Sequence, residues 1–113
     1  MMKRVYICSP LGKDIKENLR KVRRYTKYAL TCGTAPVVPH FYAECLDDSN
    51  PKEREIGKTA GLSLLWFCDE MWIFGNEITE GMADEIRFCE NFKIPVCRIK
   101  EKQIKKILGG EHK

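Results

Sequence analysis

Apolar residues follow two alternating patterns along the chain. Four short runs are apolar almost throughout, as is typical of buried strands, and they lie at positions 5–8, 35–38, 71–74 and 95–99. Between and after them, apolar residues recur every three or four positions, which predicts helices over 14–32, 51–67, 79–91 and 101–108. The first helix has the clearest pattern, because Ile15, Leu19, Val22 and Ala29 share one face and Gly33 supplies a left-handed end.

The order of strand and helix repeats four times. Strands that are apolar on both faces need helices on both sides. The pattern therefore predicts an α/β fold, a small flavodoxin-like or Rossmann-like parallel sheet of about four strands with helices on both faces. A length of 113 residues fits one domain over 1–113, and Gly109 and Gly110 predict a frayed end after the last helix.

Capping residues mark two helix starts. Asn50 followed by Pro51 predicts an N-cap and a first helical residue, and Glu53 stands where a capping-box acid reaches back to the N-cap. Thr79 is the expected N-cap of the following helix. Asp69 precedes the third strand, so we expect it to be a turn or capping residue at the edge away from any ligand.

The charge distribution permits an anionic partner without requiring one. The chain has 20 Lys and Arg against 16 Asp and Glu, a net charge of +4, and its basic residues crowd into 13–27 and 100–106. The first of these runs lies between apolar residues at helical spacing, so we interpret it as a solvated helix face rather than a nucleic-acid groove. No apolar run is long enough for a membrane span or a secretory signal, and we expect a cytoplasmic protein.

The six cysteines do not predict a disulfide scaffold or a metal site. None forms a Cys-x-x-Cys pair, and His40 and His112 do not complete a zinc pattern. Cys8 and Cys97 lie in apolar strand runs, where a thiol behaves as a small hydrophobic group, which leaves Cys45 as the expected exposed thiol. With no ligand cluster and no dinucleotide-binding glycine pattern, we expect no metal or organic cofactor.

The predicted topology restricts where a ligand can bind. In an open parallel sheet, ligands bind beyond the carboxyl ends of the strands, where loops lead into helix N-termini. The segments at this edge are 9–14, 39–50 and 75–85.

The third of these segments concentrates acidic residues at a helix start. Glu80 and Asp84 are explained by the helix dipole, which favours acids in a first turn. Glu85 lies four residues after Gly81, so its side chain leans back toward the ligand edge, and we expect the helix end to hold it ionised. An ionised, positioned carboxylate is the group that attack on an anomeric carbon requires.

Several motifs resemble the nucleoside 2-deoxyribosyltransferase superfamily over most of the chain, from Val5 to about Ile99. They are Tyr6-Ile7-Cys8-Ser9-Pro10, Pro36-Val37-Val38-Pro39-His40, and Cys68-Asp69-Glu70 leading through Gly75 to the stretch at 79–86. The resemblance implies that Glu85 is the nucleophile. It further implies substrate contacts from residues of all three loops and from the first strand: Tyr6, Ser9, Pro10, Gly12, His40, Gly75, Thr79, Gly81 and Met82.

One position departs from the family. Its enzymes carry an aspartate in the second helix that helps to handle the nucleobase, and Gly61 and Leu62 stand there in this chain. His40, Glu53 and Glu55 are the candidates at the same edge that can substitute for it. Gly61, with Gly57 four residues before it, fits either a close helix contact or an open space for a base.

Three hypotheses follow from these residues. The first is an N-glycosidic hydrolase or transferase that acts on a (deoxy)nucleoside, a nucleotide or a related N-ribosyl compound through Glu85. The second is a catalytically silent nucleotide-binding module that has lost the base-side acid. A nucleic-acid binder using the basic first helix ranks last, because no aromatic residues interleave with its cations. The resemblance also implies a homo-oligomer, since family members complete each pocket with a neighbour's residues.

Overall fold

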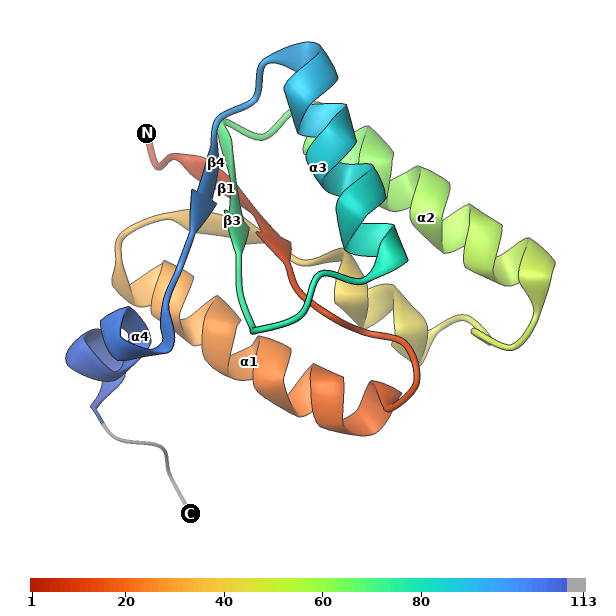
Figure 1. The fold of residues 1–113 in the computed structure, drawn as a ribbon, viewed down its shortest axis with the longest axis horizontal. Coiled ribbons are helices and arrows are strands. Elements are labelled where there is room, and N and C mark those ends of the chain that lie inside the picture. The colour runs from red at the N-terminus through yellow and green to blue at the C-terminus, as the bar shows by residue number, and fades with distance from the viewer. Residues whose placement is uncertain (110–113) are drawn as a thin grey trace.

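The computed structural model describes residues 1–109 and contains one four-stranded sheet in the order β2-β1-β3-β4 (Figure 1). All neighbouring strands are parallel. The strands are β1 (Arg4–Cys8), β2 (Ala35–Val37), β3 (Glu70–Ile73) and β4 (Val96–Arg98). The helices are α1 (Ile15–Thr31), the 3-10 helix η1 (Pro39–Glu44), α2 (Pro51–Leu65), α3 (Glu80–Phe92) and α4 (Glu101–Leu108). The predicted fold class is confirmed, and the frayed end predicted from Gly110 lies outside the described residues.

The side-chain alternation of β1 creates two separate cores. Val5 and Ile7 point to one face of the sheet and pack with residues of α1 and α4. Tyr6 and Cys8 point to the other face and pack with residues of α2 and α3. Each face of the sheet is therefore covered by its own pair of helices, as Figure 1 shows.

The two predicted caps, Asn50 and Thr79, are present, and the structure adds a third at Asp14. The carboxylate of Asp14 accepts from the backbone N–H of Glu17 before α1, and the Asn50 side chain accepts from the N–H groups of Lys52 and Glu53 before α2. The Thr79 hydroxyl accepts from the N–H of Met82 before α3. Gly33 has a φ of 84°, which confirms the left-handed end predicted after the first helix.

Several details differ from the prediction. Residues 39–44, predicted as loop, form η1, because Pro39 presets the φ angle of a first helical residue and short i to i+3 turns follow. The Glu53 carboxylate does not close a capping box on Asn50 and instead accepts from the N–H of Asp47 at 2.9 Å. Helix α2 ends at Leu65, two residues earlier than predicted.

Asp69 has the structural role predicted for it. Its carboxylate accepts from the backbone N–H of Arg4 at 2.8 Å, beside the first residue of β1. This contact lies at the amino end of the strands, away from the edge where ligands bind.

The expectation about exposed cysteines was wrong in part. All six cysteines are free, but Cys32 and Cys97 are exposed as well as Cys45. Cys97 is exposed because β4 is an edge strand whose three residues all contact solvent, and Cys32 is the C-cap of α1. Within residues 1–109, the helices are too short or too polar to cross a lipid bilayer.

Candidate functional site

Glu85 and Tyr6 form a direct pair between the sheet and α3. The Tyr6 hydroxyl donates to Oε2 of Glu85 at 2.6 Å, a short, charge-assisted geometry. Tyr6 is 1% exposed and comes from the central strand, whereas Glu85 is half-buried on the second turn of α3. The pair joins residues 79 positions apart and fixes the orientation of the carboxylate on the α2–α3 side of the sheet.

Helix α2 closes tightly on this pair at Gly61. A Cβ at this position would lie 3.1 Å from the Tyr6 hydroxyl oxygen and 3.4 Å from Cβ of Pro39, the first residue of η1. Gly57, one turn earlier, would meet Leu46 at 3.2 Å. Of the two interpretations that the sequence left open for these glycines, the structure therefore favours the close contact. Helix α2 brings no acid to the Tyr6 hydroxyl at Gly61.

Burial controls the ionisation of Glu85. Removal from water raises the pKa of its carboxyl above the ordinary 4.5, while hydrogen bonds from Tyr6 and Cys8 act in the opposite direction. Desolvation outweighs these hydrogen bonds, so the net shift of the Glu85 pKa is upward, and ionisation of Glu85 by the helix end stays a prediction. The pKa of the Tyr6 hydroxyl is also raised, first by burial and then by the neighbouring carboxylate, so Tyr6 stays a donor.

Two charged residues near Glu85, Asp84 and Lys58, influence its ionisation. The Lys58 ammonium on α2 donates to Oδ2 of Asp84 at 2.8 Å, and Arg87 also pairs with Asp84. The Asp84 charge raises the pKa of Glu85 and the Lys58 charge lowers it, both as smaller effects than burial. The Lys58–Asp84 pair thus links α2 to α3 next to the candidate nucleophile.

Ser9 and His40 couple two loops of the ligand edge. Nε2 of His40 lies 2.9 Å from the Ser9 carbonyl oxygen and 3.1 Å from its hydroxyl oxygen. Burial lowers the pKa of His40, which favours the neutral ring, and Nδ1 is a buried atom without a partner in the described structure. Both side chains are buried, and their mutual contact explains them as a structural link between the segment after β1 and η1.

The loop after β1 is shaped by polar contacts to its backbone. The Asn18 amide donates to the carbonyl oxygens of Leu11 and Gly12 at 3.0 and 3.2 Å, and Lys13 adopts a positive φ of 70°. Pro10 of this loop lies against Gly75, where a Cβ would meet Cδ of Pro10 at 3.4 Å. Gly75 also has a φ of 90°, so the loops after β1 and β3 meet at a position that favours glycine.

The remaining predicted substrate contacts lie in different surroundings. Met82 is 2% exposed and packs in the core of the α2–α3 side, while Thr79 is occupied as the N-cap of α3. Gly12 and Gly81 are exposed, with open space where a Cβ would stand. The structure thus pairs Tyr6 with Glu85, Ser9 with His40 and Pro10 with Gly75, and it brings Gly61 against Tyr6 and Pro39. Glu53 and Glu55, the other candidate acids, bind Asp47 and Thr59 respectively.

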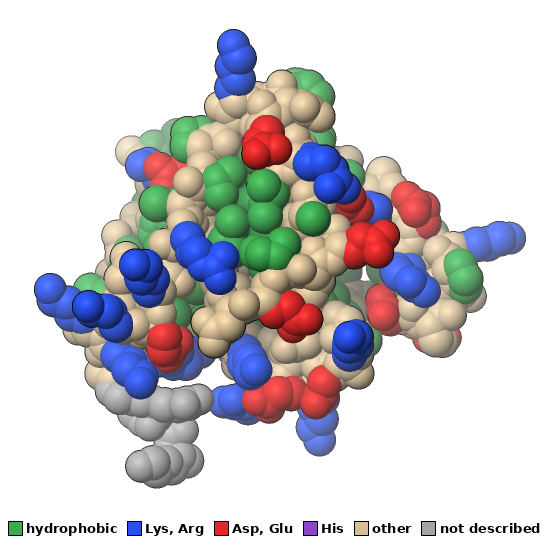
Figure 2. Space-filling model, in the orientation of Figure 1, with side chains coloured by type: hydrophobic (Ala, Val, Ile, Leu, Met, Phe, Trp, Pro, Cys, Tyr) green, Lys and Arg blue, Asp and Glu red, His purple; other side chains and the backbone are tan. Residues whose placement is uncertain are grey.

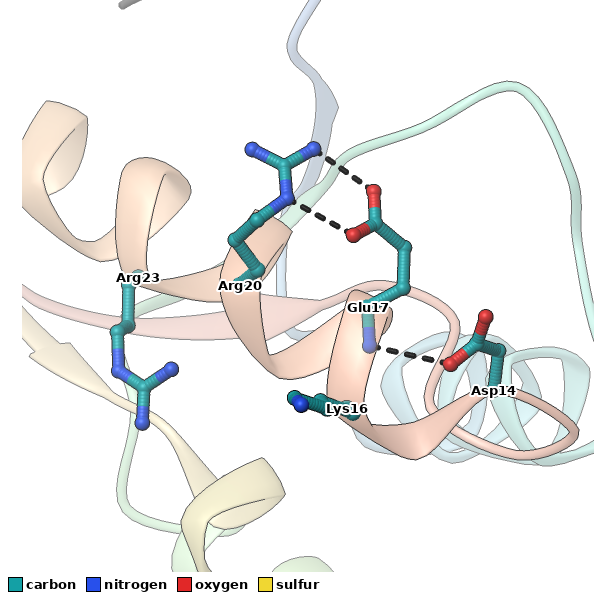
Figure 3. Close-up of a pocket in the computed structure, with 5 residues that line it drawn as sticks. All are labelled: Asp14, Lys16, Glu17, Arg20 and Arg23. Atoms are coloured by element: carbon teal, nitrogen blue, oxygen red, sulfur yellow. Dashed lines mark hydrogen bonds and ion pairs between the residues drawn. The ribbon is translucent and has the colours of Figure 1, made fainter. Parts of the chain in front are cut away.

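A hollow of about 410 Å³ lies elsewhere, on the outer side of α1. Figure 3 shows the five residues that line it: Asp14, Lys16, Glu17, Arg20 and Arg23. The Glu17 carboxylate accepts two hydrogen bonds from the Arg20 guanidinium. This hollow belongs to the opposite face of the sheet from Glu85. Within residues 1–109, no group of three or more His, Cys, Asp or Glu side chains could hold a metal ion.

Comparison with known proteins places the chain in a family. A family model described as "Domain of unknown function (DUF7768)" matches residues 3–99. The chain belongs to the DUF7768 family. No curated protein sequence matches it significantly.

Among solved structures, this member of the DUF7768 family is similar to a 2-deoxyribosyltransferase from the psychrotolerant bacterium Bacillus psychrosaccharolyticus. The TM-score is 0.66 at 16% sequence identity, and the match covers 92% of this chain and 81% of that chain. At this identity the likeness shows the fold, a Rossmann-type parallel sheet covered by helices. The family resemblance inferred from the motifs is therefore supported as a relationship of folds.

Three contacts of the site were missed by the sequence analysis. They are the close approach of Gly61 to Tyr6, the Ser9–His40 contact and the Lys58–Asp84 pair. Each joins residues from different elements, so no local motif carries it. A weak signal existed for the first, because a glycine inside a helical pattern often marks a close packing contact.

Proposed function

We propose that the chain acts on an N-glycosidic bond of a (deoxy)nucleoside, a nucleotide or a related N-ribosyl compound, with Glu85 as nucleophile. The observation that carries this proposal is the 2.6 Å contact between the Tyr6 hydroxyl and Glu85. A lone buried carboxylate would stay protonated, but a phenol donor offsets part of the desolvation and orients the group. The fold shared with a 2-deoxyribosyltransferase supports the same reaction class.

The proposed reaction has two steps. In the first, a Glu85 oxygen bonds to the anomeric carbon, the bond from that carbon to the base nitrogen breaks, and the base leaves with the electron pair and takes up a proton. In the second, water or another base attacks the same carbon and releases the carboxylate. Hydrolase and transferase differ only in this second acceptor.

The experiment is a screen for released base. Purified protein is incubated with nucleosides and nucleoside monophosphates, and free base is separated by chromatography. Glu85→Gln keeps the shape of the side chain without the nucleophile, so release should fall by about 10³-fold or more. Glu80→Gln is the matched control, since Glu80 is exposed one turn earlier on α3 and should leave release within about twofold of wild type.

A second function is favoured by two observations at the same site. Gly61 brings no acid to the base side, and burial raises the pKa of Glu85, so a chain that binds nucleotides without cleaving them is the alternative. Thermal-shift measurements on the same compounds separate the two functions. Stabilisation by a nucleotide with no base release selects the silent binding module, and release that requires Glu85 selects the enzyme.

Assembly into a homo-oligomer stays a prediction. Determining the mass of the particle in solution by light scattering tests it directly, and a mass near 13.1 kDa would contradict it.

A further inference from the structure

The charges of the chain are divided unequally between two parts of the sequence. Positions 13–27 and 100–106 together contain eleven Lys and Arg against three Asp and Glu, a net charge of +8. All other positions contain nine Lys and Arg against thirteen Asp and Glu, a net charge of −4. The modest total of +4 therefore conceals a strongly basic part and an acidic remainder.

The fold brings the two basic segments to one side of the molecule. Helix α4 packs beside α1, and Arg24 of α1 pairs with Glu101 of α4 at 2.5 Å. Ile104 of α4 lies in the same core cluster as Val22 and Tyr28 of α1. Figure 1 shows the two helices together below the sheet. In Figure 2, Lys and Arg side chains gather at the lower left of this region and alternate with Asp and Glu along the bottom. We call the exposed surface of α1, α4 and the loop residue Lys13 the basic face.

The basic face holds more unpaired cations than the rest of the described surface. At the strand starts and on the α2–α3 side, some cations are paired, as in Lys3–Glu70, Arg4–Asp69 and Lys58–Asp84, and only Lys52, Arg54 and Lys93 of α2 and of the end of α3 form no ion pair with a described residue. Seven exposed lysines of the basic face form no ion pair with any described residue: Lys13, Lys16, Lys21, Lys27, Lys102, Lys105 and Lys106. Unpaired like charges on neighbouring helices repel one another, so folding alone does not account for their concentration here.

The cations of α1 form a line along the helix. Positions 13, 16, 20, 23 and 27 are spaced by three or four residues, which places them on one side of α1 and in the loop before it. Three of them line the hollow of Figure 3, namely Lys16, Arg20 and Arg23. The 17-residue helix is about 25 Å long, enough to lie along roughly seven base pairs of a duplex.

We propose that the basic face binds the phosphate backbone of a nucleic-acid duplex without sequence preference. The sequence analysis ranked a nucleic-acid partner last because no aromatic residues interleave with the cations of the first helix. That absence argues against stacking on single-stranded bases and leaves contact with phosphates open. The addition of α4 to the same surface is the feature that the first helix alone does not reveal.

A lipid surface fits the face less well. An amphipathic helix binds a membrane through its apolar side, and the apolar side of α4 is used in the core through Ile104. The basic face lies on the opposite side of the sheet from Glu85. The failure of one of the two proposals would therefore not affect the other.

The test is fluorescence anisotropy of a labelled 30-base-pair duplex of arbitrary sequence, titrated with the full chain at several NaCl concentrations. Binding through about six phosphates should weaken by roughly 10³-fold between about 50 and 200 mM salt. Lys27→Gln combined with Lys105→Gln should weaken binding about tenfold at low salt and reduce the slope of log K against log salt by about 2.

The matched control removes two charges from other surfaces. Lys52→Gln combined with Lys93→Asn has the same net charge, and asparagine suits the left-handed conformation of Lys93. Its binding should stay within about twofold of wild type, and a second duplex of unrelated sequence should bind equally well. The proposal is overturned if no duplex binds at 50 mM salt, if both double variants weaken binding equally, or if the chain sediments with anionic vesicles but not with the duplex.

Discussion

The two faces of the sheet use charge in opposite ways. On the α2–α3 face, the half-buried Glu85 accepts a hydrogen bond from the buried Tyr6 hydroxyl, and the nearby Lys58 and Asp84 pair with each other. On the α1–α4 face, lysines are exposed and largely unpaired. Because burial strengthens an electrostatic contact and solvent screens it, a single substitution on the first face should have large effects and one on the second face small ones.

The largest effect is expected at Gly61. Gly61→Leu forces a side chain into the Tyr6 hydroxyl and Pro39, and should lower the free energy of unfolding by about 3 kcal/mol, a fall in Tm of roughly 10 °C or more. Gly81→Ala is the control, because open space surrounds Gly81 at the start of α3. Thermal unfolding followed by circular dichroism measures both, and equal effects would show that α2 does not close on Tyr6.

The second-largest loss of stability is expected for Tyr6→Phe. It removes the donor to Glu85 and should cost about 2 kcal/mol, since a hydrogen bond to a buried charged group is lost. The pKa of Glu85 should rise further, because the Tyr6 contact lowers it. Tyr42→Phe, at an exposed tyrosine, is the control in the same titration followed by carboxyl NMR. An unchanged Glu85 pKa in Tyr6→Phe would contradict the contact.

A smaller, pH-dependent effect is expected for Glu85→Gln. The pKa of Glu85 is raised in the folded state, so the folded protein holds a proton that the unfolded chain releases, and stability falls as pH rises from about 4.5 through the folded pKa. Gln does not titrate, so the variant does not lose stability over this pH range. Its Tm should equal that of wild type below pH 4 and exceed it by a few degrees near pH 8. A Tm difference that does not change with pH would contradict burial of the carboxylate.

The smallest effect is expected on the basic face. Lys102→Glu replaces a like-charge pair with Lys106 by an opposite-charge pair one helical turn apart, and should stabilise the chain by about 0.5 kcal/mol while weakening duplex binding. Urea unfolding and anisotropy measure the two quantities on the same sample. If this substitution destabilised the fold by more than 1 kcal/mol, Lys102 would have a partner that the structure does not show.

The sequence contains most of the fold and only part of the site. Helix and strand periodicity predicted all four strands and four of the helices, because apolar spacing is a local property that each element carries by itself. The structure adds η1, whose short turns leave no periodicity to read. Glu85 was singled out by its place at a helix start, but its partner Tyr6 lies 79 positions away.

The direction of the Glu85 pKa shows the limit of local reasoning. The helix start favours an ionised acid, and this effect is visible in the sequence. Desolvation by burial acts in the opposite direction and is the largest cause of the shift in the folded chain. It depends on packing between distant elements, which no local pattern shows. In the same way, the basic face depends on α4 packing beside α1, a contact between segments about 75 positions apart.

The proposal that Glu85 is the nucleophile is tested most directly by identifying the residue to which a sugar becomes attached during turnover. A substrate that releases base is mixed with the chain, quenched in acid, digested and examined by peptide mass spectrometry. The account predicts one added glycosyl group on the peptide that carries Glu85, and none in Glu85→Gln. A sugar found on another side chain, or unchanged base release by Glu85→Gln, would contradict it.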